Sequence, residues 1–191
     1  MVETCSEIEI ANILGVLDFH RELDLSAVSN LLRSSEPVTE VEYSPEKNHW
    51  LQSRFRFSDS SKYVSFYKSG TCSIVGCDSP DQLTNLVDLI IDVMDPVVQD
   101  EPTLEIKNLV CLAEYGTEFN LSQLAVAIGL ERVEYEPEQF SGLIYRDNKT
   151  AAVFLVFSSG KIIITGEDDL QAADRSYRRF KQGLNNWISS A

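Results

Sequence analysis

The chain has 191 residues, 43% of them hydrophobic, which is enough for a packed core in one or two domains. Its 30 acidic and 16 basic residues give a formal net charge of −14. This is the wrong sign for a protein that holds nucleic acid by neutralising phosphates, so composition alone favours an acidic protein that meets no nucleic acid. The alternative is a protein of a high-salt cytoplasm, where a Debye length of about 3 Å near 1 M salt screens most of the repulsion.

The first half of the chain predicts a strand, a short helix, four antiparallel strands and a longer helix. The first strand covers about Glu7–Asp18, and the short helix Leu25–Arg33 follows a capping residue, Asp24. The longer helix, Pro80–Met94, carries apolar residues at helical spacing. A short acidic connector, Asp95–Pro102, follows it.

The second half predicts the same elements in the same order. A strand, Leu104–Glu114, precedes a helix, Leu121–Gly129, that Asn120 caps. Among the strands that follow, three are joined by polar or tight turns: Phe140–Arg146, Ala151–Phe157 and Lys161–Thr165. The closing helix covers Asp168–Trp187.

The two halves are copies of one unit. Ile8–Ser26 aligns with Leu104–Ser122 at a shift of 96 residues (104 − 8), and six positions are identical. Val41–Glu46 then recurs as Val133–Glu138, and Ser69-Gly70 recurs as Ser159-Gly160. The shift shrinks to 90 because the first copy has extra residues around Phe55–Ser60. We therefore expect two repeats, residues 1–97 and 98–191, that together form one domain.

Alternation along the strands of the second copy makes both sheet faces apolar. One face carries Leu143, Phe154, Val156, Ile162 and Ile164, and the other is nearly as apolar. Antiparallel sheets usually leave one face to water, so the second apolar face predicts a binding surface. The expected fold is α+β: a pseudo-twofold saddle with a curved antiparallel sheet of about ten strands and four helices on its convex face.

The sequence excludes several classes of function. The two histidines lie far apart, and we find no nucleophile motif or Gly-rich phosphate loop, so no enzyme and no cofactor are expected. The cysteines Cys5, Cys72, Cys77 and Cys111 are scattered, which favours free thiols over a metal site. A polar start, Met1–Thr4, and no apolar run near the roughly 20 residues of a membrane span predict an intracellular protein without membrane contact.

The stretch Glu134–Gly166 resembles the second repeat of the TATA-box-binding protein family. The resemblance rests on Tyr135-Glu136-Pro137-Glu138 before Phe140, on Gly142-Leu143-Ile144-Tyr145-Arg146, and on Phe157-Ser158-Ser159-Gly160-Lys161 leading to Thr165-Gly166. It implies an archaeal-type or divergent member, since nearly the whole chain is saddle. The concave face of such a saddle binds double-stranded promoter DNA in the minor groove.

The resemblance and the chemistry of the minor groove assign roles to individual residues. A·T pairs present only acceptors there, so amide donors from Asn12 and Asn108 suit them, with a hydroxyl from Thr165. Phe140 and Phe157 are candidate wedges, a mechanism for which this family is itself a known example. The remaining candidates are apolar residues that exclude water and cations at the rim: Val110, Ile144, Val153, Leu155, Ile163, Arg146 and Lys161. The plainer alternatives are core phenylalanines, asparagines bonded to local backbone and solvated cations.

The first copy departs from the family pattern. Asn48 stands in the place of Phe140, Tyr67 in that of Phe157, and Val75 in that of Thr165. Arg54 is aligned with Arg146 across a blurred register. Three further positions of the first copy differ: Thr71 stands in the place of Lys161, Ser65 in that of Leu155 and Ser73 in that of Ile163. Either Trp50 or His49 is a candidate to replace the missing wedge.

The resemblance also implies protein partners. Glu136, Glu138 and Gln139 occupy the loop that binds transcription factor B in the family, and an acidic loop suits a basic partner helix. The alternative is a solvated turn. The last helix carries Arg175, Arg178, Arg179 and Lys181, expected to be a solvated cationic face or a contact for regulators.

Two functions follow. The first is an initiation factor, monomeric or weakly dimeric, that binds and bends A·T-rich DNA and recruits factor B and, through it, RNA polymerase in an archaeal nucleoid (or a nucleus). The second is a degenerate paralogue that binds factor B without bending DNA.

Overall fold

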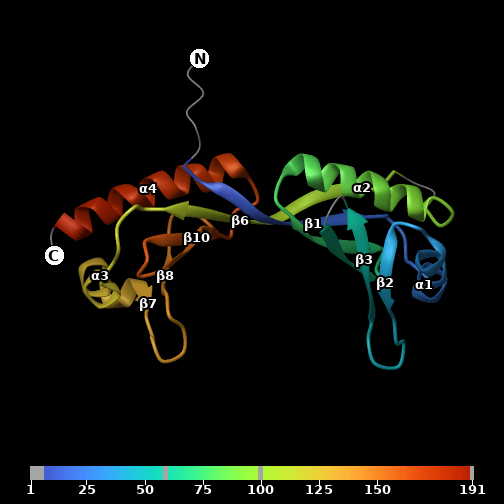
Figure 1. Ribbon diagram of the computed structural model, residues 1–191, viewed down its shortest axis with the longest axis horizontal. Coiled ribbons are helices and arrows are strands. Elements are labelled where there is room, and N and C mark those ends of the chain that lie inside the picture. The colour runs from blue at the N-terminus through green and yellow to red at the C-terminus, as the bar shows by residue number, and fades with distance from the viewer. Residues whose placement is uncertain (1–6, 58–59, 99–100, 190–191) are drawn as a thin grey trace, which may run out of the picture. The chain divides into compact units, whose positions relative to one another are not determined.

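The computed structural model describes residues 7–57, 60–98 and 101–189, and it divides into two compact units (Figure 1). The first unit is Asn12–Lys107. The second unit contains Asn108–Ala191 together with the N-terminal stretch that ends at Ala11. No helix in the described ranges is long and apolar enough to cross a bilayer.

The element order repeats once along the chain. The first half contains β1 (Glu9–Asp18), α1 (Leu25–Ser34), β2 (Val38–Glu42), β3 (Trp50–Phe57), β4 (Ser60–Tyr67), β5 (Thr71–Cys77) and α2 (Pro80–Met94). The second half contains β6 (Thr103–Glu114), α3 (Leu121–Ile128), β7 (Val133–Glu134), β8 (Leu143–Arg146), β9 (Val153–Val156), β10 (Lys161–Thr165) and α4 (Leu170–Ser189). A single 3₁₀ turn, Leu130–Arg132, has no counterpart among the described residues of the first half.

The strands form a ten-stranded sheet in the order β2-β3-β4-β5-β1-β6-β10-β9-β8-β7. Within the first half the order is β2-β3-β4-β5-β1, and within the second it is β7-β8-β9-β10-β6, which is the same arrangement in both copies. The pairings within each half are antiparallel. The α+β class, the ten strands and the four α-helices expected from the sequence are therefore confirmed.

Each unit buries one sheet face beneath its own two helices. In the second unit, the rings of Phe154 and Phe180 stack with centroids 4.1 Å apart, and Tyr145 and Trp187 pack around Phe180. The strand residues expected on this face are fully or almost fully buried: Leu143, Phe154, Val156, Ile162 and Ile164. Of the two apolar faces expected from the sequence, this one is therefore the core.

Helix starts follow the capping residues that the sequence contains. In α1, the Asp24 carboxylate accepts hydrogen bonds from the backbone of Ser26 and Ala27, and in α3 the Asn120 side chain accepts from Gln123 at 3.1 Å. In α4 the side chain of Asp169 accepts from the backbone N–H of Ala172, so the helix begins two residues later than expected.

Two strands of the second copy are shorter than expected, and the one predicted over Ala151–Phe157 covers only Val153–Val156. The strand expected over Phe140–Arg146 covers only Leu143–Arg146. The reason is a turn before it, in which the backbone N–H groups of Gln139 and Phe140 both donate to the carbonyl of Glu136, each at 2.9 Å. Backbone committed to this turn is not available to a sheet ladder. The extra residues expected in the β3–β4 turn include 58–59, and those two, like Cys5, lie outside the described residues.

Candidate nucleic-acid interface

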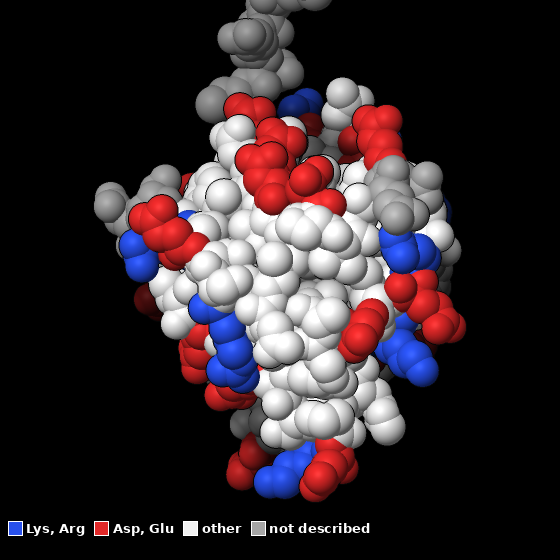
Figure 2. Space-filling model, turned by 90° about the vertical axis from the view of Figure 1, so that its right-hand side faces the viewer, with Lys and Arg blue, Asp and Glu red and all other residues white. Residues whose placement is uncertain are grey.

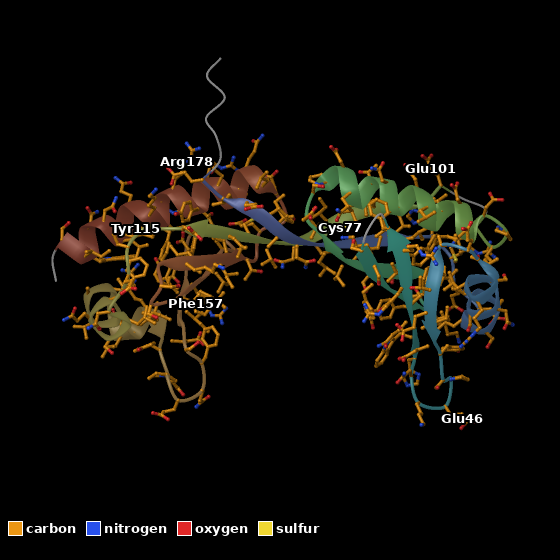
Figure 3. All side chains as sticks on the ribbon, in the orientation of Figure 1. Glu46, Cys77, Glu101, Tyr115, Phe157 and Arg178 are labelled. Carbon is orange, nitrogen blue, oxygen red and sulfur yellow. The ribbon has the colours of Figure 1, made fainter. Side chains whose placement is uncertain are left out.

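The sheet face opposite the helices of each unit is here called its open face. In the second unit it carries residues from four strands, all half-buried or exposed: Asn108, Val110, Leu112, Ile144, Arg146, Val153, Leu155, Lys161, Ile163 and Thr165. Figure 3 shows Phe157 on the side of these strands that faces away from α4. The candidate DNA-binding residues of the second copy therefore share one face.

A continuous apolar row crosses this open face. Leu112 of β6 lies opposite Ile163, Ile163 lies opposite Leu155, and Leu155 lies opposite Ile144. Sequence reasoning missed Leu112, although counting in twos from Asn108 along the strand would have found it. The row is only half-buried, so it leaves hydrocarbon available to a partner.

The asparagine at the equivalent place in each copy is held in one orientation. In the first unit, the backbone N–H of Gly76 donates to Oδ1 of Asn12 at 2.7 Å. In the second, Gly166 N–H donates to Oδ1 of Asn108 at 2.8 Å, and the Thr165 hydroxyl donates to the same oxygen at 3.0 Å. Because a backbone N–H can only donate, the side-chain atom that it contacts must be the amide oxygen. The orientation of the amide is thereby fixed, with its NH₂ group directed away from the glycine. Within the described residues neither NH₂ group has a hydrogen-bond partner.

Phe140 and Phe157 form an aromatic pair at the end of the open face of the second unit. Their ring centroids are 5.8 Å apart and their planes meet at 71°, an edge-to-face contact. Both are half-buried, and neither lies in the core beneath the helices. Gly142 lies directly under them, since a Cβ built there would be 2.7 Å from Phe140. The pair therefore lies outside the core, on the face that the helices leave uncovered.

The open face of the first unit is more polar. Its central row consists of Val16, Ser73, Ser65 and Gln52, which lie opposite one another from strand to strand. Val75 lies opposite Tyr63. At one end, Trp50 lies opposite Tyr67, and both side chains are 37% exposed.

The rim cations of the two units occupy equivalent positions but are already paired. Arg54 lies opposite Tyr63 as Arg146 lies opposite Val153, which settles the blurred register of the first copy. Arg54 pairs with Glu40 at 3.0 Å and Arg146 with Glu134 at 2.9 Å. A phosphate would have to displace these carboxylates. Lys161 is exposed and forms no ion pair within the described residues.

The cationic face expected on the last helix is exposed at its three arginines, but most of its charges are paired. Arg178 pairs with Asp174, Arg179 with Asp147 at 2.5 Å, and Lys181 with Glu7. Three of its four cations are therefore neutralised within the protein, because acidic residues from outside the helix or one turn away lie beside them. Figure 2 views the first unit from its side, and there too acidic groups are interspersed with fewer basic ones around a broad uncharged area.

The candidate partner loop lies between β7 and β8. Glu136, Glu138 and Gln139 are all exposed, and Gln139 donates to the Glu136 carboxylate at 2.6 Å. A cavity of about 450 Å³ beside this loop is lined by both charged and apolar side chains, including Glu136, Gln139, Leu130, Val133 and Ile144. Leu130 is 68% exposed. The loop thus offers carboxylates next to hydrocarbon.

The described cysteines are buried free thiols. Burial raises the pKa of Cys72 and Cys77, and raises the pKa of Cys111 to about 11. Among the described residues, no group of three or more His, Cys, Asp or Glu side chains is placed to hold a metal ion.

Comparison with known proteins gives consistent results. A family model described as "Transcription factor TFIID (or TATA-binding protein, TBP)" matches residues 7–97 and 103–187. The chain is similar to TATA-box-binding protein C of Halobacterium salinarum, with 37% identity over 95% of this chain and 99% of the relative. It is 33% identical to the TATA-box-binding protein of Picrophilus torridus, over 93% and 94% of the two chains.

A solved structure is similar as well. The fold matches Methanococcus jannaschii TBP with a TM-score of 0.79 and 29% sequence identity, over 94% of this chain and 98% of that one.

Proposed function

This chain belongs to the TATA-binding protein family of DNA-binding transcription factors, which are not enzymes, and on that premise we propose how it works. It binds A·T-rich promoter DNA through the minor groove and bends it. It then recruits transcription factor B and, through it, RNA polymerase in an archaeal cytoplasm. The repeats 1–97 and 98–191 each supply one open face to the DNA.

The observation that carries the proposal is the fixed amide of Asn12 and of Asn108. In the minor groove, A·T pairs offer acceptors, adenine N3 and thymine O2, and no donor. An asparagine whose oxygen is held by a glycine N–H presents only its NH₂ group, and so matches that pattern. A guanine in the same place would present its own amino donor, which the NH₂ group repels.

The aromatic pair supplies the bend. The rings of Phe140 and Phe157 contact each other edge to face, so each limits the motion of the other. The pair therefore acts as a rigid wedge against a base step of the DNA that lies on the open face. Unstacking one step costs a few kcal/mol, offset by the extra surface that bent DNA brings into contact; this family is itself a known example of that mechanism. The apolar row from Leu112 to Ile144 is the surface that gains contact.

The acidic composition sets the conditions for binding. With a net charge of −14 and with Arg54 and Arg146 paired to glutamates, phosphate neutralisation contributes little to affinity. Burial of the open face should supply most of it, and this contribution survives high salt. Similar proteins come from halophilic archaea, which supports a salt-rich setting.

Factor B binds at the loop between β7 and β8. Glu136 and Glu138 attract a basic helix, and the exposed Leu130 beside them gives that helix an apolar contact. The Glu136→Lys/Glu138→Lys variant should therefore lose factor B from the ternary complex and keep binary DNA binding. A variant that retains factor B would remove this loop from the proposal.

The test of DNA binding is a titration of a fluorescent A·T-rich duplex from 0.1 to about 2 M KCl, with a G·C duplex as competitor. We expect saturable binding to the A·T duplex that persists at molar salt, and a fluorescence-transfer change between end labels that reports bending. Absence of any DNA complex across this range, together with binding of factor B alone, would instead establish the interaction module.

A further inference from the structure

We propose that Trp50 and Tyr67 are the DNA wedge of the first unit, with the Trp50 indole in the place that the Phe140 ring occupies in the second unit. This inference rests on the proposed function, since its ligand is a base step of duplex DNA. The family-type phenylalanines are missing from the first copy, where Asn48 and Tyr67 stand at their positions. The structure indicates that an aromatic residue is nevertheless present, two residues further along the chain.

The geometry of the second unit defines what is to be replaced. A Cβ built on Gly142 would lie 2.7 Å from Cε1 of Phe140 and 3.2 Å from Cε1 of Phe157. Both rings therefore occupy the space in which a side chain at position 142 would begin. Position 142 is a glycine because Phe140, from two residues earlier, folds over it.

The backbone of the first unit is the same at these positions. Asn48 N–H donates to the carbonyl of Ser44 at 2.8 Å, as Phe140 N–H donates to that of Glu136 at 2.9 Å. After the second aromatic position, Gly70 N–H donates to Tyr67 at 3.1 Å, as Gly160 N–H donates to Phe157 at 3.0 Å. Positions 48, 50 and 67 thus correspond to 140, 142 and 157.

The side chains at two of these positions are exchanged. The bulky ring is at 140 and glycine at 142 in the second unit, whereas the first has Asn48 and then Trp50. Trp50 lies directly opposite Tyr67 across the β3–β4 pair. Directly opposed residues point to the same face, so both rings belong to the open face. Trp50 therefore lies beside Tyr67, which occupies the position of Phe157.

The exposure of the two aromatic side chains supports a role in binding. Trp50 and Tyr67, each 37% exposed, are the only large hydrophobic residues described as exposed in the first unit. That these two face each other on a sheet side without helices marks a contact surface rather than two scattered residues. The Tyr67 hydroxyl lies 3.4 Å from that of Ser73, which steadies its ring on this face.

The second sequence candidate, His49, is placed differently. It lines a cavity of about 510 Å³ with Asn48, Glu22, Asp24 and Lys68. The carboxylates of Glu22 and Asp24 repel a phosphodiester backbone, so this cavity does not suit DNA. Trp50 does not line this cavity and lies opposite Tyr67 in the β3–β4 pair.

The experiment uses the protein's own fluorescence. The chain has two tryptophans, so the Trp187→Phe variant leaves Trp50 as the only one. Titration with an unlabelled A·T-rich duplex in molar KCl should quench Trp50 emission in proportion to complex formed, because the indole stacks on a base. In parallel, Trp50→Ala should weaken DNA binding about tenfold or more, and Trp50→Phe by clearly less.

The decisive variant moves the ring back. Asn48→Phe/Trp50→Gly copies the pattern of Phe140 and Gly142, and it should recover most of the affinity that Trp50→Ala loses. Ile188→Ala is the matched control, because Ile188 is an exposed hydrophobic residue on α4, and it should bind DNA as the parent does. Circular dichroism and thermal melting confirm that each variant is folded.

The failures are distinguishable. If Phe157→Ala loses DNA while Trp50→Ala binds normally and Trp50 emission is unchanged, the first-unit wedge is refuted and the proposed function stands. The Trp50→Ala variant can also be folded and fail to bind DNA while Asn48→Phe/Trp50→Gly recovers none of the affinity. In that case the indole does not act as a relocated wedge, and the inference is refuted. If the parent protein binds no duplex at any salt concentration, the proposed function and the inference fall together.

Discussion

Phe140 and Phe157 meet edge to face over Gly142, with ring centroids 5.8 Å apart, on the side of the sheet that the helices leave bare. Both rings are half-buried and lie outside the core beneath the helices. Phe157→Ala should therefore weaken DNA binding about tenfold or more, and it should lower the free energy of unfolding by less than a core substitution does. Fluorescence anisotropy and urea unfolding measure the two quantities.

The matched control is Phe154→Ala, three residues away on the opposite face. Phe154 is fully buried and stacks on Phe180, so its loss should cost about 3–5 kcal/mol of unfolding free energy. Comparable destabilisation by both substitutions would show that Phe157 is a core residue after all.

Asn108→Asp tests the role of the amide NH₂ group separately from that of the amide oxygen. The aspartate still accepts the hydrogen bonds of Gly166 and Thr165, so the thermal midpoint should change little. The NH₂ donor is lost and a negative charge faces the groove, so affinity for the A·T duplex should fall by at least tenfold. Asn12→Asp should behave likewise through Gly76. Unchanged affinity in both variants would show that the amides do not contact bases.

The polar row of the first unit predicts a gain of function. Gln52 and Ser73 correspond to Ile144 and Ile163 of the second unit, and lie beside Ser65 in the first. Gln52→Ile adds hydrocarbon to the open face and leaves the Ser73 hydroxyl beside Tyr67, so affinity for an all-A·T duplex should rise severalfold, with the larger gain at high salt. An anisotropy titration at two salt concentrations tests this. A loss of affinity would mean that the polar row contacts DNA through its own hydrogen bonds.

The buried thiols predict a pH dependence of stability. Burial raises the pKa of Cys111 from 9.0 to about 11, so between these values the unfolded chain releases a proton that the folded chain keeps. The thiol's contribution is complete below pH 9, and the free energy of unfolding should fall as the pH rises toward 11. Urea unfolding at pH 8, 9.5 and 10.5 measures the decline, which Cys111→Ala should make shallower. Equal slopes would exclude this thiol as a cause.

Local patterns predicted most of the fold. Period-two alternation sorted the residues of β8, β9 and β10 onto two faces, and the internal repeat predicted the two-copy order of strands and helices. The start of β8 was misplaced because alternation continues through Phe140, although the turn at Glu136 has already taken its backbone hydrogen bonds. The alternation of residue types does not show that a turn and a strand compete for the same backbone hydrogen bonds.

The candidate site was predictable where side chains of one face lie close in sequence. Leu155, Phe157 and Ile163 were placed on one face by counting in twos. The partners of the cations were not predictable, because Arg179–Asp147 and Lys181–Glu7 join residues far apart in sequence. The role of glycine at 142 was equally hidden, since it depends on a ring from another position.

The unlike central rows, Val16–Ser73–Ser65–Gln52 in one copy and Leu112–Ile163–Leu155–Ile144 in the other, have a consequence for direction. Because A·T and T·A pairs present the same acceptors in the minor groove, a protein with two identical halves would bind an A·T-rich element equally well in either direction. Under the proposed function, hydroxyls and an amide in one unit and hydrocarbon in the other would distinguish the two ends of such an element, and we expect the protein to prefer one orientation on it.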